Sequence, residues 1–338
     1  MATNFPDTSI DNPFVTPPRP WINGDEFDDT TKSGLTYYWN DPVWKTKAGD
    51  ITVPSLNGGP LAGFRNYIIN GDFRIWQRGE SIDSVNTGNP KFNADRWRYI
   101  VAGEGSTIAK SDNAPAGFAY SCFISNGQGS NCQQRIELPE PGNPGPFAIG
   151  TEWTYSFWST VDPATTGNPN PFLQFRDRNI GNNTNAATFT PYRTLETSGA
   201  FTRYAFTATI NAAPHPTNDS LVVLVPCTGP GDTYFTGVQL EPGPVATPFE
   251  HRPIGTELAL CQRYYQQGQH FMRAQPNTQL SGTVQAVPSF RVAPSINTSV
   301  TAGTSLTAFR ATESSFLWEA VPDGFGQVDF TYTATAEL

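Results

Sequence analysis

Apolar and polar side chains alternate along several short stretches of the chain. Between residues 153 and 159 aromatic rings alternate with hydroxyl groups, and 201–210, 234–240 and 328–334 also read as strands. Because successive side chains of a β-strand point to opposite faces, the period of two in 153–159 predicts a strand with one buried face. The stretch 221–225 is apolar throughout, which predicts a central strand covered on both faces.

Turn-forming residues separate these stretches, and no helical period lies between them. Glycine and proline number 30 each, and they cluster with asparagine in segments such as 141–146. Short strands joined by such turns predict an antiparallel jelly-roll sandwich, which we place at residues 61–254. Residues 67–69, followed by an Asn-Gly-Asp turn, are expected to form its opening strand.

A different pattern follows the sandwich. In residues 255–267, apolar side chains fall on roughly one side of a helix that Thr256 can cap. We therefore expect a short bridging helix, followed by a small β domain at 268–338. The fold class is thus mainly β.

Residues 1–60 are polar and rich in proline, which predicts an extended N-terminal arm. Within it, 37–44 reads as two strands around an Asn-Asp-Pro turn. A hairpin alone is marginally stable, so we expect the arm to dock on a partner protein. A flexible leader is the alternative, above all for residues 1–20. The aromatic candidates for this attachment are Trp21, Tyr38, Trp39 and Trp44.

Charge and composition exclude several classes of protein. The net charge is −9, and lysine and arginine are scattered, so the chain lacks the basic surface of a nucleic-acid binder. No apolar stretch is long enough to span a membrane, and the first residues do not resemble a secretory signal. We therefore expect a protein that is made in a cytoplasm and leaves the cell by lysis or with a particle.

The cysteines and histidines give no sign of a metal centre or a cofactor. None of the four cysteines forms a C-x-x-C pair, and the three histidines lack metal-ligand spacing. We expect reduced, buried thiols, with a Cys122–Cys132 disulfide as the alternative.

Catalysis has little support in the sequence. No nucleophile elbow and no P-loop occurs. Glu137, Asp177 and Glu241 are candidate carboxylates for glycoside hydrolysis, but surface ion pairs explain such residues more often. We expect that the protein is not an enzyme and has no catalytic residues.

Three stretches resemble a family of tail-fibre and virion structural proteins found in phages of cyanobacteria and other marine hosts. They are 70–79 (NGDFRIWQRG), 94–97 (ADRW) and 237–265, which includes GVQLEPG, ATPFEHR and LCQRYY. The hairpin at 37–44 also resembles segments of tail-fibre proteins. The resemblance implies a carbohydrate-binding-module-like jelly roll on a virion, whose first strand pairs with 237–240. It also leads us to expect Trp76 and Trp97 in the core.

The resemblance further implies a structural calcium ion between the first and last strands. Here Arg74 replaces an expected acidic residue, and Thr236-Gly237 replaces an acidic pair. Asp72 and Glu241 remain as oxygen ligands. Because of these departures, we expect no metal.

Sugars stack on exposed rings, so aromatic residues are the candidates for glycan binding. With 23 Phe, 12 Tyr and 8 Trp, most rings must belong to the core. The candidates are Trp153, Trp158, Phe172, Tyr192 and Trp318.

The leading hypothesis is a tail-fibre or tail-appendage protein that attaches to glycan on the host surface. Such a protein is expected to be a homotrimer that contacts other virion proteins through its N-terminal arm. A capsid decoration or head-fibre protein is the alternative. A polysaccharide-degrading tailspike and a free bacterial sugar-binding protein are weaker hypotheses, because neither β-helix repeats nor an export signal is present.

Overall fold

The computed structural model divides the chain into two compact units, Met1–Pro54 and Ser55–Leu338. The residues that the structure describes are 26–29, 35–40, 43–46, 64–85, 91–100, 105–125, 131–165, 172–177, 182–189, 191–225, 231–273, 280–302, 306–320 and 327–337.

The first unit contains a small antiparallel sheet. Its strands are β1 (Glu26–Asp29), β2 (Leu35–Asn40) and β3 (Val43–Thr46), in that order. The register of β2 and β3 pairs Asn40 with Val43, so the predicted hairpin is confirmed. Of the predicted attachment residues, Trp21 lies outside the described residues. For Tyr38, Trp39 and Trp44 only the backbone is described, so their role stays a prediction.

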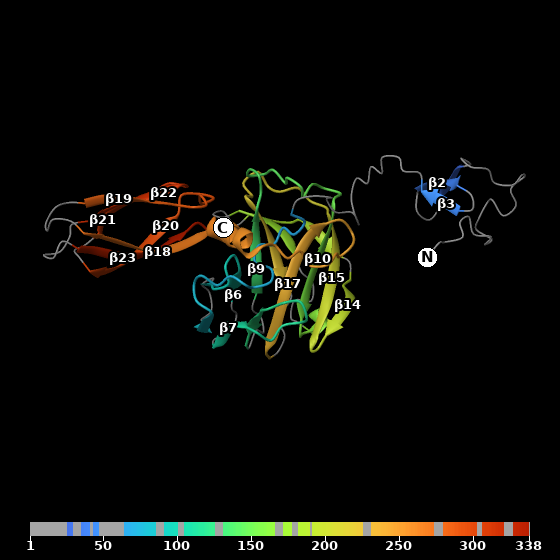
Figure 1. The fold of residues 1–338 in the computed structure, drawn as a ribbon, viewed down its shortest axis with the longest axis horizontal. Coiled ribbons are helices and arrows are strands. Elements are labelled where there is room, and N and C mark those ends of the chain that lie inside the picture. The colour runs from blue at the N-terminus through green and yellow to red at the C-terminus, as the bar shows by residue number, and fades with distance from the viewer. Residues whose placement is uncertain are drawn as a thin grey trace, which may run out of the picture. The chain divides into compact units, whose positions relative to one another are not determined.

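The second unit begins with a sandwich of two antiparallel sheets, as predicted. The larger sheet contains β4 (Ser81–Val85), β7 (Ser106–Ser111), β8 (Ser121–Ile124), β10 (Glu152–Ser159), β13 (Ala187–Phe189), β14 (Arg193–Ser198), β15 (Phe201–Ile210) and β17 (Thr233–Pro242). Its order is β13-β15-β10-β17-β8-β7-β4, with β14 also paired to β15. Figure 1 shows β10, β15 and β17 side by side.

The smaller sheet covers one face of the larger one. It contains β5 (Lys91–Phe92), β6 (Arg98–Ile100), β9 (Asn131–Glu137), β11 (Leu173–Arg176), β12 (Asn183–Asn185) and β16 (Ser220–Val225). Its order is β12-β11-β16-β9-β6-β5, and a short 3-10 helix spans Pro163–Thr165. All six residues of β16 are buried, which confirms the predicted central strand.

Aromatic side chains fill the space between the two sheets. Trp97, Tyr155 and Phe157 are fully buried there, and Phe73 stacks on Trp97 with ring centroids 5.1 Å apart. Trp76 is also buried in this core. The predicted core positions of Trp76 and Trp97 are therefore confirmed.

Strand β10 is buried on both faces, although the sequence predicted one buried face. Three of its four rings point into the core, but Thr154 and Ser156 on the opposite face are also fully buried, and Trp158 lies on that face too. The segment after β17 covers them, because Thr154 Oγ1 donates a hydrogen bond of 2.6 Å to the carbonyl of Gly243. The outer face of this sheet is therefore partly covered by the chain itself.

The predicted opening strand at 67–69 is wrong, although the segment does lie beside β17. The amide of Tyr67 donates to Leu240 and that of Val238 donates to Gly71, each at 2.9 Å. Between these bonds, the side-chain amide of Asn66 contacts the backbone of Val238 and Leu240 in place of a neighbouring strand. The side chain of Asn66 thus makes the hydrogen bonds to β17 that the backbone of a regular strand would otherwise make.

Three of the cysteines are buried free thiols, as predicted, and Cys227 lies outside the described residues. Cys122 is on β8 and Cys132 is on β9, which belong to different sheets. The alternative of a bond across neighbouring strands is therefore wrong. Burial raises the pKa of the Cys122 thiol to about 12, which keeps it protonated.

The helix that follows is shorter than predicted. Helix α1 spans Ile254–Gln262, and Pro253 rather than Thr256 occupies its N-cap position. Proline suits a helix start because its missing N–H would have no partner there. Strand β18 already begins at Tyr265, which ends the predicted 255–267 helix early. No helix in the described part of the chain is long and apolar enough to cross a membrane.

Two three-stranded sheets form the C-terminal β domain. Their strands are β18 (Tyr265–Arg273), β19 (Leu280–Gln285), β20 (Ser295–Ala302), β21 (Leu306–Ala311), β22 (Ser315–Ala320) and β23 (Gln327–Thr335). The orders are β18-β23-β20 and β19-β22-β21 (Figure 1). Phe316, Trp318 and Phe330 form the core between them. The terminal strand predicted at 328–334 is confirmed.

A charged junction ties the C-terminal residues to the sandwich. Glu337 contacts two arginines: Nη2 of Arg78 lies 2.8 Å from its Oε1, and Arg96 contacts its Oε2. The guanidinium of Arg78 lies 3.8 Å from the ring centre of Tyr265, and that of Arg96 lies 3.3 Å from the ring centre of Tyr264. These five residues are called the junction below.

Candidate functional site

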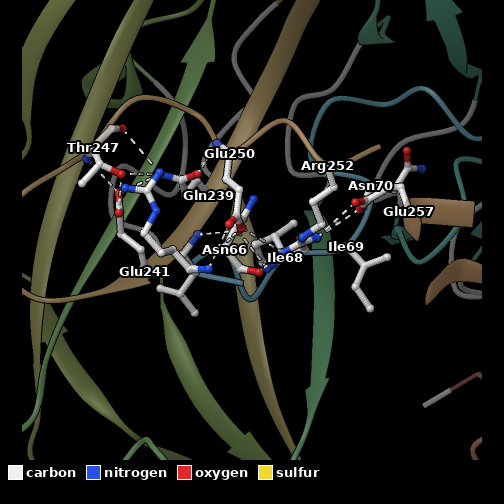
Figure 2. Close-up of polar contacts among 12 residues, drawn as sticks. Asn66, Ile68, Ile69, Asn70, Gln239, Glu241, Thr247, Glu250, Arg252 and Glu257 are labelled. Atoms are coloured by element: carbon white, nitrogen blue, oxygen red, sulfur yellow. Dashed lines mark hydrogen bonds and ion pairs between the residues drawn. The ribbon is translucent and has the colours of Figure 1, made fainter. Parts of the chain in front are cut away.

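A buried polar network fixes the segment 243–252 to the outer face of the larger sheet (Figure 2). The Glu241 carboxylate accepts hydrogen bonds from the amide (2.9 Å) and the hydroxyl (2.6 Å) of Thr247. The Gln239 side chain donates to Glu241 at 2.8 Å and accepts from the amide of Glu250 at 2.9 Å. The path of the segment is therefore set by side chains of β17.

Arg252 extends this network to helix α1. It is 6% exposed, donates to the carbonyl of Ile68 at 3.1 Å, and pairs with Glu257 at 3.2 Å. The Glu250 carboxylate accepts from the amide of Asn66 at 2.9 Å. Figure 2 shows Arg252 between Asn66 and Glu257. With these partners, the buried guanidinium of Arg252 fixes the C-terminal end of the segment 243–252.

The turn at Asn70 is built into the same network. The amide of Asn70 donates a hydrogen bond to the Glu257 carboxylate. The side chain of Asn70 accepts a hydrogen bond from the N–H of Ile75 (3.0 Å) and donates one to its C=O (2.8 Å). The indole of Trp97 donates to the Asn70 carbonyl at 2.8 Å. These contacts explain why Asn70 adopts a φ of 56°. The stretches that carry the family resemblance thus have architectural roles here.

The residues present do not fit a calcium ion. The Nε of Arg74 lies 2.5 Å from Asp72, and the same guanidinium donates to the carbonyl of Arg252 at 2.8 Å. Asp72 therefore has a fixed positive partner, and Glu241 is occupied by Thr247 and Gln239. In the ranges that the structure describes, no three His, Cys, Asp or Glu side chains gather as metal ligands.

On its outward side, the same segment presents two rings. Those of Phe249 and His251 have centroids 4.9 Å apart, and Phe118 lies 5.1 Å from the first and 5.2 Å from the second. The His251 side chain is 51% exposed, and the two phenylalanines are half-buried. These three residues are called the ring cluster below. Rings fixed in this way offer a stiff, partly apolar surface to a ligand.

Polar groups border the ring cluster. Asp72 Oδ2 lies 4.0 Å from Nδ1 of His251, and its second oxygen is buried without a hydrogen-bond partner. Gly237, with a φ of 61°, lies beneath Phe118, because a Cβ there would stand 2.6 Å from that ring. The bare backbone of Gly237 therefore lets the ring approach the sheet.

The structure contradicts three of the predicted glycan-binding residues. Trp153 and Trp318 are at most 1% exposed and Trp158 is 6% exposed, so their rings offer no face to a sugar. Each is covered by packing that its own stretch of sequence does not reveal. Phe172 and Tyr192 are half-buried, and neither belongs to the ring cluster. The Tyr192 hydroxyl donates to Asp162 at 2.6 Å.

The sequence reasoning missed all three members of the ring cluster. A signal existed for two of them, since rings alternate with charged residues in 249–252. Phe118 gave no signal, because it follows a turn in a segment without period. Of the candidate carboxylates, Glu137 pairs with Arg263 (3.3 Å) and Arg291 (2.9 Å). Glu241 instead bonds Thr247 and Gln239, so the two carboxylates have no partner in common.

No family model and no curated protein matches the chain. Among solved structures, similarity extends to a sugar-binding protein of Bacteroides thetaiotaomicron, with 15% identity and a TM-score of 0.31 over 53% of this chain and 100% of that chain. Tailspike protein 4 of bacteriophage CBA120 has 15% identity and a TM-score of 0.28 over 52% of this chain and 21% of that chain. A family 16 carbohydrate-binding module has 16% identity and a TM-score of 0.22 over 39% of this chain and 84% of that chain. Similarity of this degree decides neither ligand nor function.

Proposed function

We propose that this chain is a bacteriophage virion structural protein, a tail-fibre or tail-appendage component whose sandwich binds glycan on the host surface. The observation that carries the glycan-binding part is the ring cluster of Phe118, Phe249 and His251. Its rings are partly exposed, mutually packed and held from beneath by a buried polar network. Aromatic faces pack against the C–H faces of sugars, while bordering polar groups bond their hydroxyls.

The virion part of the proposal rests on the resemblance of 70–79, 94–97 and 237–265 to phage virion proteins. The separate first unit, Met1–Pro54, suits an anchor to another virion protein. We further propose a homotrimer, because weak glycan contacts gain strength when several copies act together. We propose that the role is binding rather than catalysis, because two of the three candidate carboxylates, Glu137 and Glu241, are engaged by partners within the chain.

Binding of the full chain to an array of host lipopolysaccharide, capsule and other polysaccharides tests the glycan-binding part. Phe249→Ala removes a ring from the cluster and is expected to weaken binding about tenfold, which corresponds to ~1.4 kcal/mol. Phe271→Ala, which removes a 53% exposed ring from the C-terminal domain, is the matched control. If no glycan binds, or if both variants behave alike, the ring cluster is not the site.

Antibody labelling of intact phage particles tests the virion part. Label on the tail supports the tail-fibre proposal, whereas label on the capsid contradicts that position. Absence from purified particles would refute a virion role altogether. Analytical ultracentrifugation of the purified chain measures whether it is a trimer.

A further inference from the structure

A second pair of rings lies on the outer face of the larger sheet. Phe123 on β8 and Tyr234 on β17 are directly paired in register, and their ring centroids are 4.9 Å apart. Cys122, Ile124 and Phe235 beside them belong to the core, so the two rings point away from it. Both are half-buried. They are called the ring pair below.

The ring pair and the ring cluster lie on the same face. Trp158 pairs in register with Thr236 on that face, and the ring of Trp158 lies with that of Phe118 over Gly237. Tyr234 and Gly237 are three positions apart on β17, which is about 10 Å at ~3.4 Å per strand residue. This separation is too long for one sugar ring and suits successive sugars of a chain.

Buried side chains of the sheet lie between the two sets of rings. Thr236 and Trp158 lie there, and the Thr236 hydroxyl donates to the carbonyl of Tyr120 at 2.8 Å. On the far side of the ring pair, Phe123 is paired with Ala109 on β7. One sheet therefore holds the two sets of rings at a fixed separation.

We propose that the outer face binds a linear glycan chain, with one sugar against the ring cluster and another against the ring pair. This deepens the proposed function and rests on it. Because both sets of rings are held by the same sheet, a chain long enough to reach both makes the second contact without a second loss of translational freedom. A short fragment makes only one of the two contacts.

Affinity as a function of glycan length tests this inference on the unaltered full chain. The polysaccharide that binds best on the array is cut and size-fractionated, and each fraction is measured by calorimetry. Affinity is expected to rise about tenfold once the fragment spans both ring sets, and then to level off. Affinity that is the same for one or two sugars as for longer fragments would overturn the inference and leave the proposed function standing.

Variants locate the second contact. Phe123→Ala combined with Tyr234→Ala is expected to abolish the gain with length while leaving the affinity for short fragments unchanged. Phe249→Ala should weaken short and long fragments alike, and Phe271→Ala should change neither. Absence of any glycan binding would overturn both the inference and the proposed function.

Discussion

Asp95 is predicted to make the folded protein less stable as the pH rises towards neutrality. Its side chain is 1% exposed and lies beside the junction. The amide of Gln77 donates to it at 2.7 Å, and Nη1 of Arg78 lies 3.7 Å away. Burial outweighs these contacts and raises the pKa of Asp95 from 3.8 to about 6.

The direction of the effect follows from this raised pKa. The folded state holds the proton more tightly than the unfolded state, so the stabilisation is fully present below pH 3.8 and is lost as the pH rises through about 6. Raising the pKa from 3.8 to about 6 corresponds to ~3 kcal/mol. The nearby carboxylate of Glu337 acts in the same direction, and Arg78 opposes it.

Urea unfolding of the full chain and of the Asp95→Asn variant, at intervals from pH 4 to pH 7.5, measures the effect. Asparagine cannot ionise, so the stability of the unaltered chain relative to the variant should fall by about 3 kcal/mol across this range. The control is Asp232→Asn, which removes one negative charge from an exposed residue. A stability difference between the unaltered chain and the Asp95→Asn variant that does not change with pH would refute the reasoning.

Three further predictions concern packing and charge. Gly237→Ala places a Cβ against Phe118 at a φ of 61°, and should cost about 1–2 kcal/mol of stability together with glycan affinity. Glu337→Ala leaves Arg96, whose side chain is 2% exposed, without its carboxylate, and should cost about 3–5 kcal/mol in a urea melt. Trp318→Ala empties the C-terminal core and should cost about 3–5 kcal/mol, while unchanged glycan binding would confirm that this ring is not part of the site.

The strands at 201–210, 221–225 and 234–240 could be predicted from the sequence, because alternation and apolar runs are local properties of a strand. The prediction at 67–69 failed for a reason that is not local. There the side chain of Asn66 bonds the backbone of β17, and no pattern within the segment distinguishes this from strand pairing. The helix start failed similarly, since Pro253 and Thr256 are both acceptable near a helix N-terminus.

The sequence by itself determined a mainly β protein, rich in rings and built around antiparallel sandwiches. It could not determine which rings are exposed. Trp153 and Trp158 are buried because distant segments lie over both faces of β10, and Phe118 meets Phe249 and His251 because a buried network brings the 243–252 segment back across the sheet. Burial depends on what packs against a side chain, and that is decided only when residues far apart in the chain come together.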